Sequence, residues 1–295
     1  MTDETPTVGL VGLGLMGQGF AECLRDTGFD LTGYDIDPTR CEQAARYGTT
    51  IAASPRAVAE SSTLVLVCVT TTAAVEQVVF ASDGVAAGAR AESVLIDLST
   101  TEVPATRQMA ERLLASGMAW IDAPVSGGPE AARSGNLAIM AGGDAAAFER
   151  ARPVLERLAA TLTHFGPVGS GQVAKMVNQI LVLNNYVILA EALALAEAGG
   201  IDAAKLPAAL APGHAGSNLL SALFPRLIER DFEPRGYARQ VLKDLDAVQA
   251  LAKSLGTPAP MSGQAGGLYR ILASKGHGKL DGAAILKLYD PEETL

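Results

Sequence analysis

The segment from Gly169 to Gly200 constrains the fold most, because it contains one long apolar helix between two glycine-containing turns. Residues 172–198 contain neither proline nor glycine, so the predicted helix is uninterrupted. At about 1.5 Å per residue it would be roughly 40 Å long, which is enough to be shared by two domains. Its second half is apolar on nearly every side, and we therefore expect it to be buried in a core or against another subunit.

The start of this helix is more polar than the rest. Lys175, Asn178 and Gln179 stand at positions i, i+3 and i+4, so a cation and two amides share one face. A solvated lysine with capping amides is the alternative interpretation, since polar residues are common in first turns. The residues that precede the helix favour a site.

The N-terminal residues predict a dinucleotide-binding fold. The apolar run 8–13 predicts a strand, and a second strand ends at Asp35, eighteen residues after a glycine motif. That motif is G-x-G-x-x-G, formed by Gly12, Leu13, Gly14, Leu15, Met16 and Gly17. In this context Gly12 allows a tight turn, Gly14 allows a pyrophosphate to approach, and Gly17 allows the following helix to pack closely. The helix N-terminus offers N–H groups to the phosphates.

Asp35 bears on the choice of cofactor. A carboxylate at this position accepts hydrogen bonds from the adenosine ribose of NAD and repels the additional phosphate of NADP. Arg40 lies near it in the sequence and brings a positive charge. We therefore expect NAD as cofactor, with NADP as the alternative.

Two further apolar runs, 64–69 and 94–98, predict parallel strands that are covered on both faces. Small polar residues follow each run, at the carboxyl ends of the strands, where ligands bind in open parallel sheets. Val69, Thr70 and Thr100 are therefore expected near the cofactor. The hydroxyls that follow the two strands can also cap the next helices, and the two roles are compatible.

The chain after residue 200 is predicted to be helical, with breaks at proline and glycine. The predicted fold is α/β. A Rossmann-like doubly wound sheet occupies residues 1–168, and an all-α domain for substrate binding or dimerisation occupies residues 169–295. The long helix joins them.

Charge and cysteine content exclude several classes of protein. A net charge of −9 disfavours nucleic acid or an anionic membrane as partner. Asn184, Asn185 and Glu191 interrupt the most apolar stretch and disfavour a membrane span. The acidic N-terminus lacks an apolar signal segment, so we expect a cytoplasmic protein. The three cysteines lack C-x-x-C spacing, which predicts neither disulfides nor a metal site.

A loop at residues 122–128 reads Asp-Ala-Pro-Val-Ser-Gly-Gly, and its bare N–H groups and hydroxyl suit a carboxylate. Three other motifs accompany it: Gly-Leu-Gly-x-Met-Gly at 12–17, Gly-x-Gly-x-x-x-Lys-x-x-Asn-Gln at 169–179, and Lys-Asp-Leu at 243–245. Together they resemble the β-hydroxyacid dehydrogenase family. The resemblance covers essentially the whole chain, and four motifs in the correct order make it specific.

This resemblance implies an oxidoreductase that interconverts a small 3-hydroxy acid and its semialdehyde with NAD(P). Lys175 matches the family's catalytic lysine. Oxidation of an alcohol needs a base for the hydroxyl proton, and desolvation beside a positive nicotinamide is expected to lower the pKa of this amine.

The resemblance also places the remaining site residues. The substrate is expected to contact Ser126, Gly127, Gly128, Asn178 and Gln179. Lys243 is expected near the nicotinamide. Departures from the family pattern occur at 69–70, where Leu-Pro is common, at 135–137, and at 234–237, where the family has an aromatic wall.

Asn178-Gln179 and the run 215–217 resemble the branch that acts on 2-hydroxy-3-oxopropionate (tartronate semialdehyde). Polar side chains suit a substrate with an additional hydroxyl. The alternatives are 3-hydroxyisobutyrate, L-threonate and succinic semialdehyde. A non-catalytic NAD-binding sensor or scaffold and an imine reductase are rival functions, and Lys175 with the Ser-Gly-Gly loop favours the hydroxyacid enzyme. A homodimer or homotetramer is expected from the apolar helix.

Overall fold

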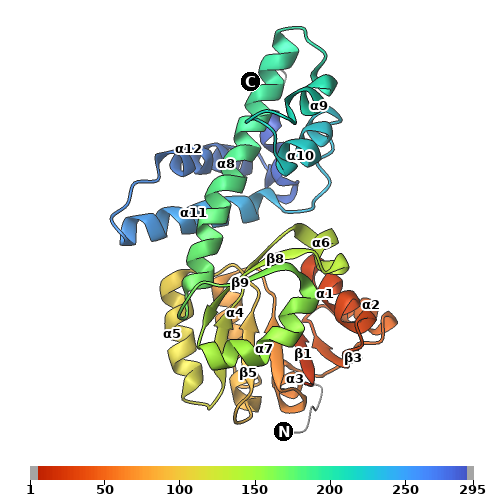
Figure 1. Ribbon diagram of the computed structural model, residues 1–295, viewed down its shortest axis with the longest axis vertical. Coiled ribbons are helices and arrows are strands. Elements are labelled where there is room, and N and C mark those ends of the chain that lie inside the picture. The colour runs from red at the N-terminus through yellow and green to blue at the C-terminus, as the bar shows by residue number, and fades with distance from the viewer. Residues whose placement is uncertain (1–5, 291–295) are drawn as a thin grey trace. The chain divides into compact units, whose positions relative to one another are not determined.

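The computed structural model describes residues 6–290, which divide into two compact units between Lys175 and Met176. The first unit is a sheet with helices on both faces, and the second is helical (Figure 1). The predicted α/β class with an all-α C-terminal part is confirmed. The division falls inside the long helix, whereas the boundary predicted from the sequence precedes Gly169.

Within the described residues, nine strands form the sheet, in the order β3-β2-β1-β4-β5-β6-β8-β7, with β9 on β8. The strands are β1 Val8–Val11, β2 Leu31–Tyr34, β3 Thr50–Ile51, β4 Leu64–Val67, β5 Val94–Asp97, β6 Ala119–Asp122, β7 Val125–Ser126, β8 Leu137–Gly143 and β9 Ala159–His164. The first six are parallel, while β8 runs antiparallel to β6 and β7. The chain reverses its direction of winding between β1 and β4, and ligands bind at such switch points.

Four of the seven α-helices described in the first unit begin at a residue whose side chain caps them. The seven helices are α1 Leu15–Asp26, α2 Pro38–Arg46, α3 Pro55–Ser61, α4 Thr72–Phe80, α5 Val103–Leu114, α6 Gly128–Ser134 and α7 Ala145–Leu158, with a 3-10 turn η1 Val85–Gly88. Side-chain oxygens accept first-turn N–H groups at Asp37, Ser54, Thr71 and Asp144. Each cap satisfies a donor that has no partner within its helix.

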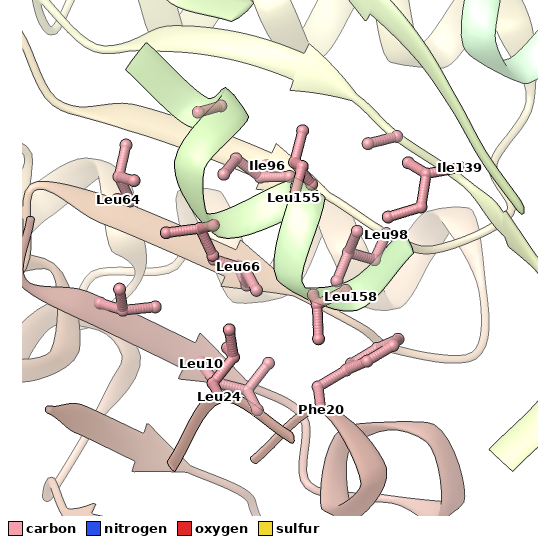
Figure 2. Packing of buried hydrophobic residues seen from close by; sticks show 14 of the residues in the cluster. Leu10, Phe20, Leu24, Leu64, Leu66, Ile96, Leu98, Ile139, Leu155 and Leu158 are labelled. Atoms are coloured by element: carbon pink, nitrogen blue, oxygen red, sulfur yellow. The ribbon is translucent and has the colours of Figure 1, made fainter. Parts of the chain in front are cut away.

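Alternate strand residues face two separate cores. On β4, Leu64 and Leu66 join the cluster beneath α1 and α7, while Val65 and Val67 join the cluster beneath α3, α4 and α5. Figure 2 shows Leu155 of α7 among the strand residues of the first cluster. Burial on both faces explains why these strands read as continuous apolar runs.

The second unit begins within helix α8, Ser170–Ala198, which is uninterrupted as predicted. It also contains η2 Ala203–Lys205, α9 Leu206–Leu210, α10 Asn218–Ile228, α11 Ala238–Ser254, α12 Pro260–Ser274, η3 His277–Lys279 and η4 Gly282–Tyr289. Residues of α8, α10, α11, α12 and η4 form its core, including the fully buried Tyr269. This core is separate from those of the first unit.

Helix α8 is buried on one side only. By length and composition it could cross a membrane, with a mean hydropathy of 1.6 over 18 residues, and the core helix of a soluble protein meets the same criterion. Its inner side chains belong to the core of the second unit, while Val177, Leu181, Ile188 and Leu195 are at least half exposed. One chain therefore leaves an apolar stripe of α8 uncovered.

Candidate active site

Two glycines of the predicted cofactor loop are required by close backbone contacts. Gly12 follows β1 with a φ of +97°, and a Cβ there would lie 2.1 Å from the carbonyl oxygen of Cys68. A Cβ at Gly17 would lie 2.0 Å from the carbonyl oxygen of Gly12. At Gly14 a Cβ would meet only the Arg40 guanidinium, at 3.7 Å. The loop is thus tight on the protein side and open at Gly14, which fits the approach of a pyrophosphate.

The residues between these glycines have different environments. Leu13 is fully buried in the core, Met16 is half-buried and Leu15 is exposed. Gly14 begins α1 without a side-chain cap. The start of α1 can therefore offer backbone N–H groups to an anion, and these residues fit a dinucleotide.

Asp35 fixes the glycine loop to the end of β2. Its Oδ2 accepts a hydrogen bond from the Leu13 N–H at 2.7 Å, and its Oδ1 accepts one from the Asp37 N–H at 2.9 Å. Nη1 of Arg40 lies 3.6 Å from Asp35, and Nε of Arg40 lies 3.5 Å from Asp37. The guanidinium offsets part of the negative charge that a 2′-phosphate would meet here.

The loops after β4 and β5 are joined by Ser99. Its Oγ accepts a hydrogen bond from the Val69 N–H at 3.0 Å, and its own N–H donates to Asp97. Thr70 is exposed and Thr100 is half-buried, each in the loop where the sequence placed it. Thr71 caps α4, so the capping interpretation is correct for this hydroxyl.

Two buried carboxyls end the central strands. Asp97 of β5 and Asp122 of β6 are register partners, and both are fully buried. Burial raises the pKa of Asp97 to about 7, against hydrogen bonds from Ser99 and Thr101 that lower it. Burial raises the pKa of Asp122 to about 6, against backbone donors at Gly169 and Gln172.

Asp122 caps helix α8 from outside the helix. Its Oδ1 accepts from the Gly169 N–H at 2.7 Å, and its Oδ2 accepts from the Gln172 N–H at 2.9 Å. A Cβ at Gly171 would lie 2.3 Å from the carbonyl oxygen of Met140, so the first turn packs directly on the strand backbone. A carboxylate is favourable at the positive end of a helix.

Lys175 lies one turn further along α8 and is only 6% exposed. Its Nζ donates a hydrogen bond to the carbonyl oxygen of Val125 at 2.8 Å. Val125 and Ser126 form β7, and Gly127 and Gly128 lead into α6. The predicted catalytic amine and the predicted carboxylate loop are therefore adjacent in the first unit.

The other predicted substrate residues belong to the second unit. Asn178 Nδ2 donates to Gln179 Oε1 at 2.9 Å, and Gln179 Nε2 donates to Asp244 Oδ2 at 2.5 Å. Lys243 pairs with the same carboxylate at 3.1 Å. Gln179 is buried, and both ends of its amide are used within the protein. Its contacts give it the role of holding Asn178.

Two motifs that the sequence associated with the substrate have structural explanations. Ser217 caps α10 through the Leu220 N–H at 3.0 Å, and a Cβ at Gly216 would lie 2.3 Å from the carbonyl oxygen of Ala211. Tyr237 begins α11, and the guanidinium of Arg239 stacks on its ring at 4.7 Å.

Sequence reasoning missed the roles of Asp97, Asp122 and Gln172. A usable signal was present for the two acids, because two apolar strands both end in Ile-Asp or its equivalent at the carboxyl edge of the sheet. Nothing near Gln172 in the sequence indicates its partners, which are about 50 to 70 residues away.

Comparison with known proteins identifies the family. Residues 7–166 match the NAD binding domain of 6-phosphogluconate dehydrogenase. Residues 169–289 match the family described as the NAD-binding of NADP-dependent 3-hydroxyisobutyrate dehydrogenase. The chain belongs to the β-hydroxyacid dehydrogenase family. It is an NAD(P)-dependent hydroxyacid dehydrogenase that acts on CH–OH donors, as the resemblance predicted.

Individual relatives carry different substrate names. The chain is 33% identical to 2-hydroxy-3-oxopropionate reductase of Escherichia coli, over 95% of this chain and 96% of that protein. It is 31% identical to the NAD-dependent L-serine dehydrogenase of Pseudomonas aeruginosa, over 97% and 98%. A crystal structure of 3-hydroxyisobutyrate dehydrogenase from Salmonella typhimurium superposes with a TM-score of 0.89 at 32% identity, covering 96% and 99%.

The Asp35 and Arg40 pair predicts a measurable cofactor effect. Asp35→Asn keeps an acceptor for the Leu13 N–H but removes the charge, so kcat/KM with NADP should rise relative to NAD by about 10-fold, since a hydrogen bond to a charged group contributes ~1.5–3 kcal/mol. Arg40→Ala should move the ratio in the opposite direction. Steady-state kinetics with both cofactors measure this ratio. An unchanged ratio in both variants would contradict a role of Asp35 and Arg40 in cofactor choice.

Asp97 predicts a pH effect on stability. Its folded pKa of about 7 exceeds the unfolded value of 3.8, so the folded state binds more protons between these pH values. Stability should therefore fall as pH rises from about 4 to about 7 and then level off. Asp97→Asn should make this fall shallower. Thermal melts of the native protein and of Asp97→Asn at pH 5 and pH 8 test this prediction. An equal change in melting temperature between the two pH values in both proteins would show that Asp97 does not titrate in this range.

Proposed function

We propose that the protein catalyses the reversible oxidation of a 3-hydroxy acid to its semialdehyde, with Lys175 as the acid–base group and 2-hydroxy-3-oxopropionate as the substrate of reduction. The observation that carries the proposal is the buried Lys175 amine, 2.8 Å from the Val125 carbonyl at the edge of the Ser126–Gly127 loop. It combines a proton-transfer group with a carboxylate cradle.

The chemistry assigns Lys175 one task in each direction. In oxidation, neutral Nζ accepts the proton of the substrate hydroxyl, and in reduction protonated Nζ returns it to the forming alkoxide. A bound nicotinamide accepts or supplies the hydride. The Val125 carbonyl holds the amine in place, and burial excludes competing water. Such a group contributes about 10²–10⁴-fold to the rate.

The Ser126–Gly128 loop is assigned to the substrate carboxylate. Its hydroxyl and backbone N–H groups are local donors in a chain whose net charge is −9, so the attraction must come from the loop itself. Holding the carboxylate fixes the hydroxyl-bearing carbon relative to Lys175. We also assign Lys243 to the nicotinamide end of the cofactor, and this assignment rests on the family resemblance.

Asn178 supports the choice among substrates. Glycerate, L-serine and 3-hydroxyisobutyrate share a carboxylate and a 3-hydroxyl, and they differ at C2 in carrying a hydroxyl, an ammonium or a methyl group. Asn178 gives one N–H to Gln179 and can still offer a second N–H and its carbonyl oxygen. A hydroxyl can satisfy both kinds of group, whereas a methyl group leaves them unpaired.

A steady-state screen tests the function. We expect glycerate and 2-hydroxy-3-oxopropionate to have a kcat/KM at least about 10-fold above 3-hydroxyisobutyrate, with L-serine, L-threonate and succinic semialdehyde as the other substrates compared. Lys175→Ala should lower turnover by about 10²–10⁴-fold with unchanged NADH binding, while the exposed-lysine control Lys253→Ala keeps full activity. Preference for the methyl-bearing substrate would overturn the substrate, and native turnover of Lys175→Ala would overturn the mechanism.

We also propose that a second copy of the chain covers the exposed stripe of α8. Val177, Leu181, Ile188 and Leu195 recur at spacings of four and seven residues, so they share one face over about 27 Å. The four side chains are apolar, and an apolar surface can pair with the same surface of a second copy, as a two-fold interface requires.

Association through this stripe can be measured directly. Leu181→Glu should convert an oligomer to monomers by placing a charge in the interface, whereas Leu114→Glu, at the exposed last residue of α5, should leave the assembly intact. Light scattering of the three proteins gives the molar masses. A monomeric unmodified protein at working concentration would exclude this interface.

A further inference from the structure

Within the first unit, a buried chain of hydrogen bonds joins the predicted cofactor loops to the start of α8. The Val69 N–H donates a hydrogen bond to Ser99 Oγ, and the Ser99 N–H donates one to Asp97 Oδ1. Gln172 Nε2 then donates to the carbonyl oxygen of Ser99 at 2.8 Å, and Gln172 Oε1 accepts from the Thr101 N–H at 3.1 Å. The chain links β4, β5 and α8 without passing through solvent.

Gln172 is the centre of this chain. Its side chain is fully buried, and its own N–H donates to Asp122. Three polar groups of one residue therefore bind three fixed backbone or side-chain partners. Lys175 follows at i+3, so the two residues lie one turn apart on neighbouring parts of the helix surface.

We propose that Gln172, together with Asp122, is a positioning residue that sets Lys175 relative to the loops carrying Val69, Thr70 and Thr100. The proposal rests on the acid–base role given above to Lys175. A shift of the first turn of α8 would break the bonds to the 99–101 loop and to Asp122 at once. The register of the helix start is therefore coupled to the loops that are expected to hold the cofactor.

The effect of losing this coupling can be bounded. A misplacement of about 1 Å in a catalytic group costs about 100-fold in rate. Replacing Gln172 by an apolar residue leaves the Thr101 N–H and the Ser99 carbonyl buried without partners, so the contact must open or shift. A purely structural glutamine would instead lower the melting temperature without slowing the chemical step.

The test compares Gln172→Leu with Leu155→Ala, a core substitution in the same unit that lowers stability away from the site. We expect kcat to fall about 10–100-fold in Gln172→Leu, with NADH affinity within about threefold of the native value. The primary deuterium isotope effect on kcat should rise, because hydride transfer becomes slower. Leu155→Ala, assayed below its melting temperature, should keep both kcat and the isotope effect.

A double-mutant cycle with Lys175→Ala separates the possible failures. If Gln172 acts through Lys175, Gln172→Leu should have little further effect on kcat in the Lys175→Ala background. Additive losses, or native kcat in Gln172→Leu, would overturn the positioning role while leaving that of Lys175 intact. Native turnover of Lys175→Ala would overturn the proposed function and this inference with it. Asp122→Asn, which keeps the shape of the cap, repeats the test if Gln172→Leu does not fold.

Discussion

The contact on which the proposed active site in the first unit depends is the Asp122 carboxylate at the N-terminus of α8. Its two oxygens accept hydrogen bonds from the N–H of Gly169, which directly precedes the helix, and from the N–H of Gln172 in the first turn, at 2.7 and 2.9 Å. Burial raises the pKa of Asp122 to about 6, and those donors oppose the rise by stabilising its charged form. The helix end and the buried acid therefore support one another. Because Gln172 and Lys175 lie within the first two turns of α8, this contact determines the positions of both side chains.

In the central strands of the sheet, the interior residues form the apolar cores, while buried acids stand at the carboxyl ends of β5 and β6. Alternate residues of β4 fill two apolar cores, while β5 and β6 end in buried acids. The interiors of β4 and β5 carry only apolar residues, whereas at the carboxyl ends of β5 and β6 loop and helix N–H groups donate to the buried carboxyls and offset the cost of burying their charge. Polar networks thus collect at the carboxyl ends of the parallel strands, the edge of the sheet where a cofactor is expected.

Much of this architecture could be predicted from the sequence, because its signals are local. Continuous apolar runs identified the parallel strands β1, β4 and β5, while the short parallel strand β3 was not predicted, and the glycine motif predicted its two tight contacts at Gly12 and Gly17. Strands β7 to β9 were not predicted, since they are stabilised by pairing with one another rather than by a periodic pattern. Gln172 gave no signal, because its hydrogen-bond partners come from the loop after β5 and from the end of β6. The exposed stripe on α8 could not be predicted either, since the sequence does not show which side of an apolar helix is covered.

In the second unit, an ion pair sets the orientation of the Asn178 amide. Asp244, paired with Lys243, accepts from one end of the Gln179 amide, because a carboxylate offers only acceptors. That contact orients Gln179 so that its oxygen faces Asn178, and Asn178 must then donate through Nδ2. The amide therefore presents a fixed pair, one N–H and one carbonyl oxygen, whose orientation is set by a charge on α11. For the proposed function, a substrate hydroxyl could pair with both groups whereas a methyl group could not, and this difference is the reason for proposing a C2 hydroxyl over a C2 methyl group.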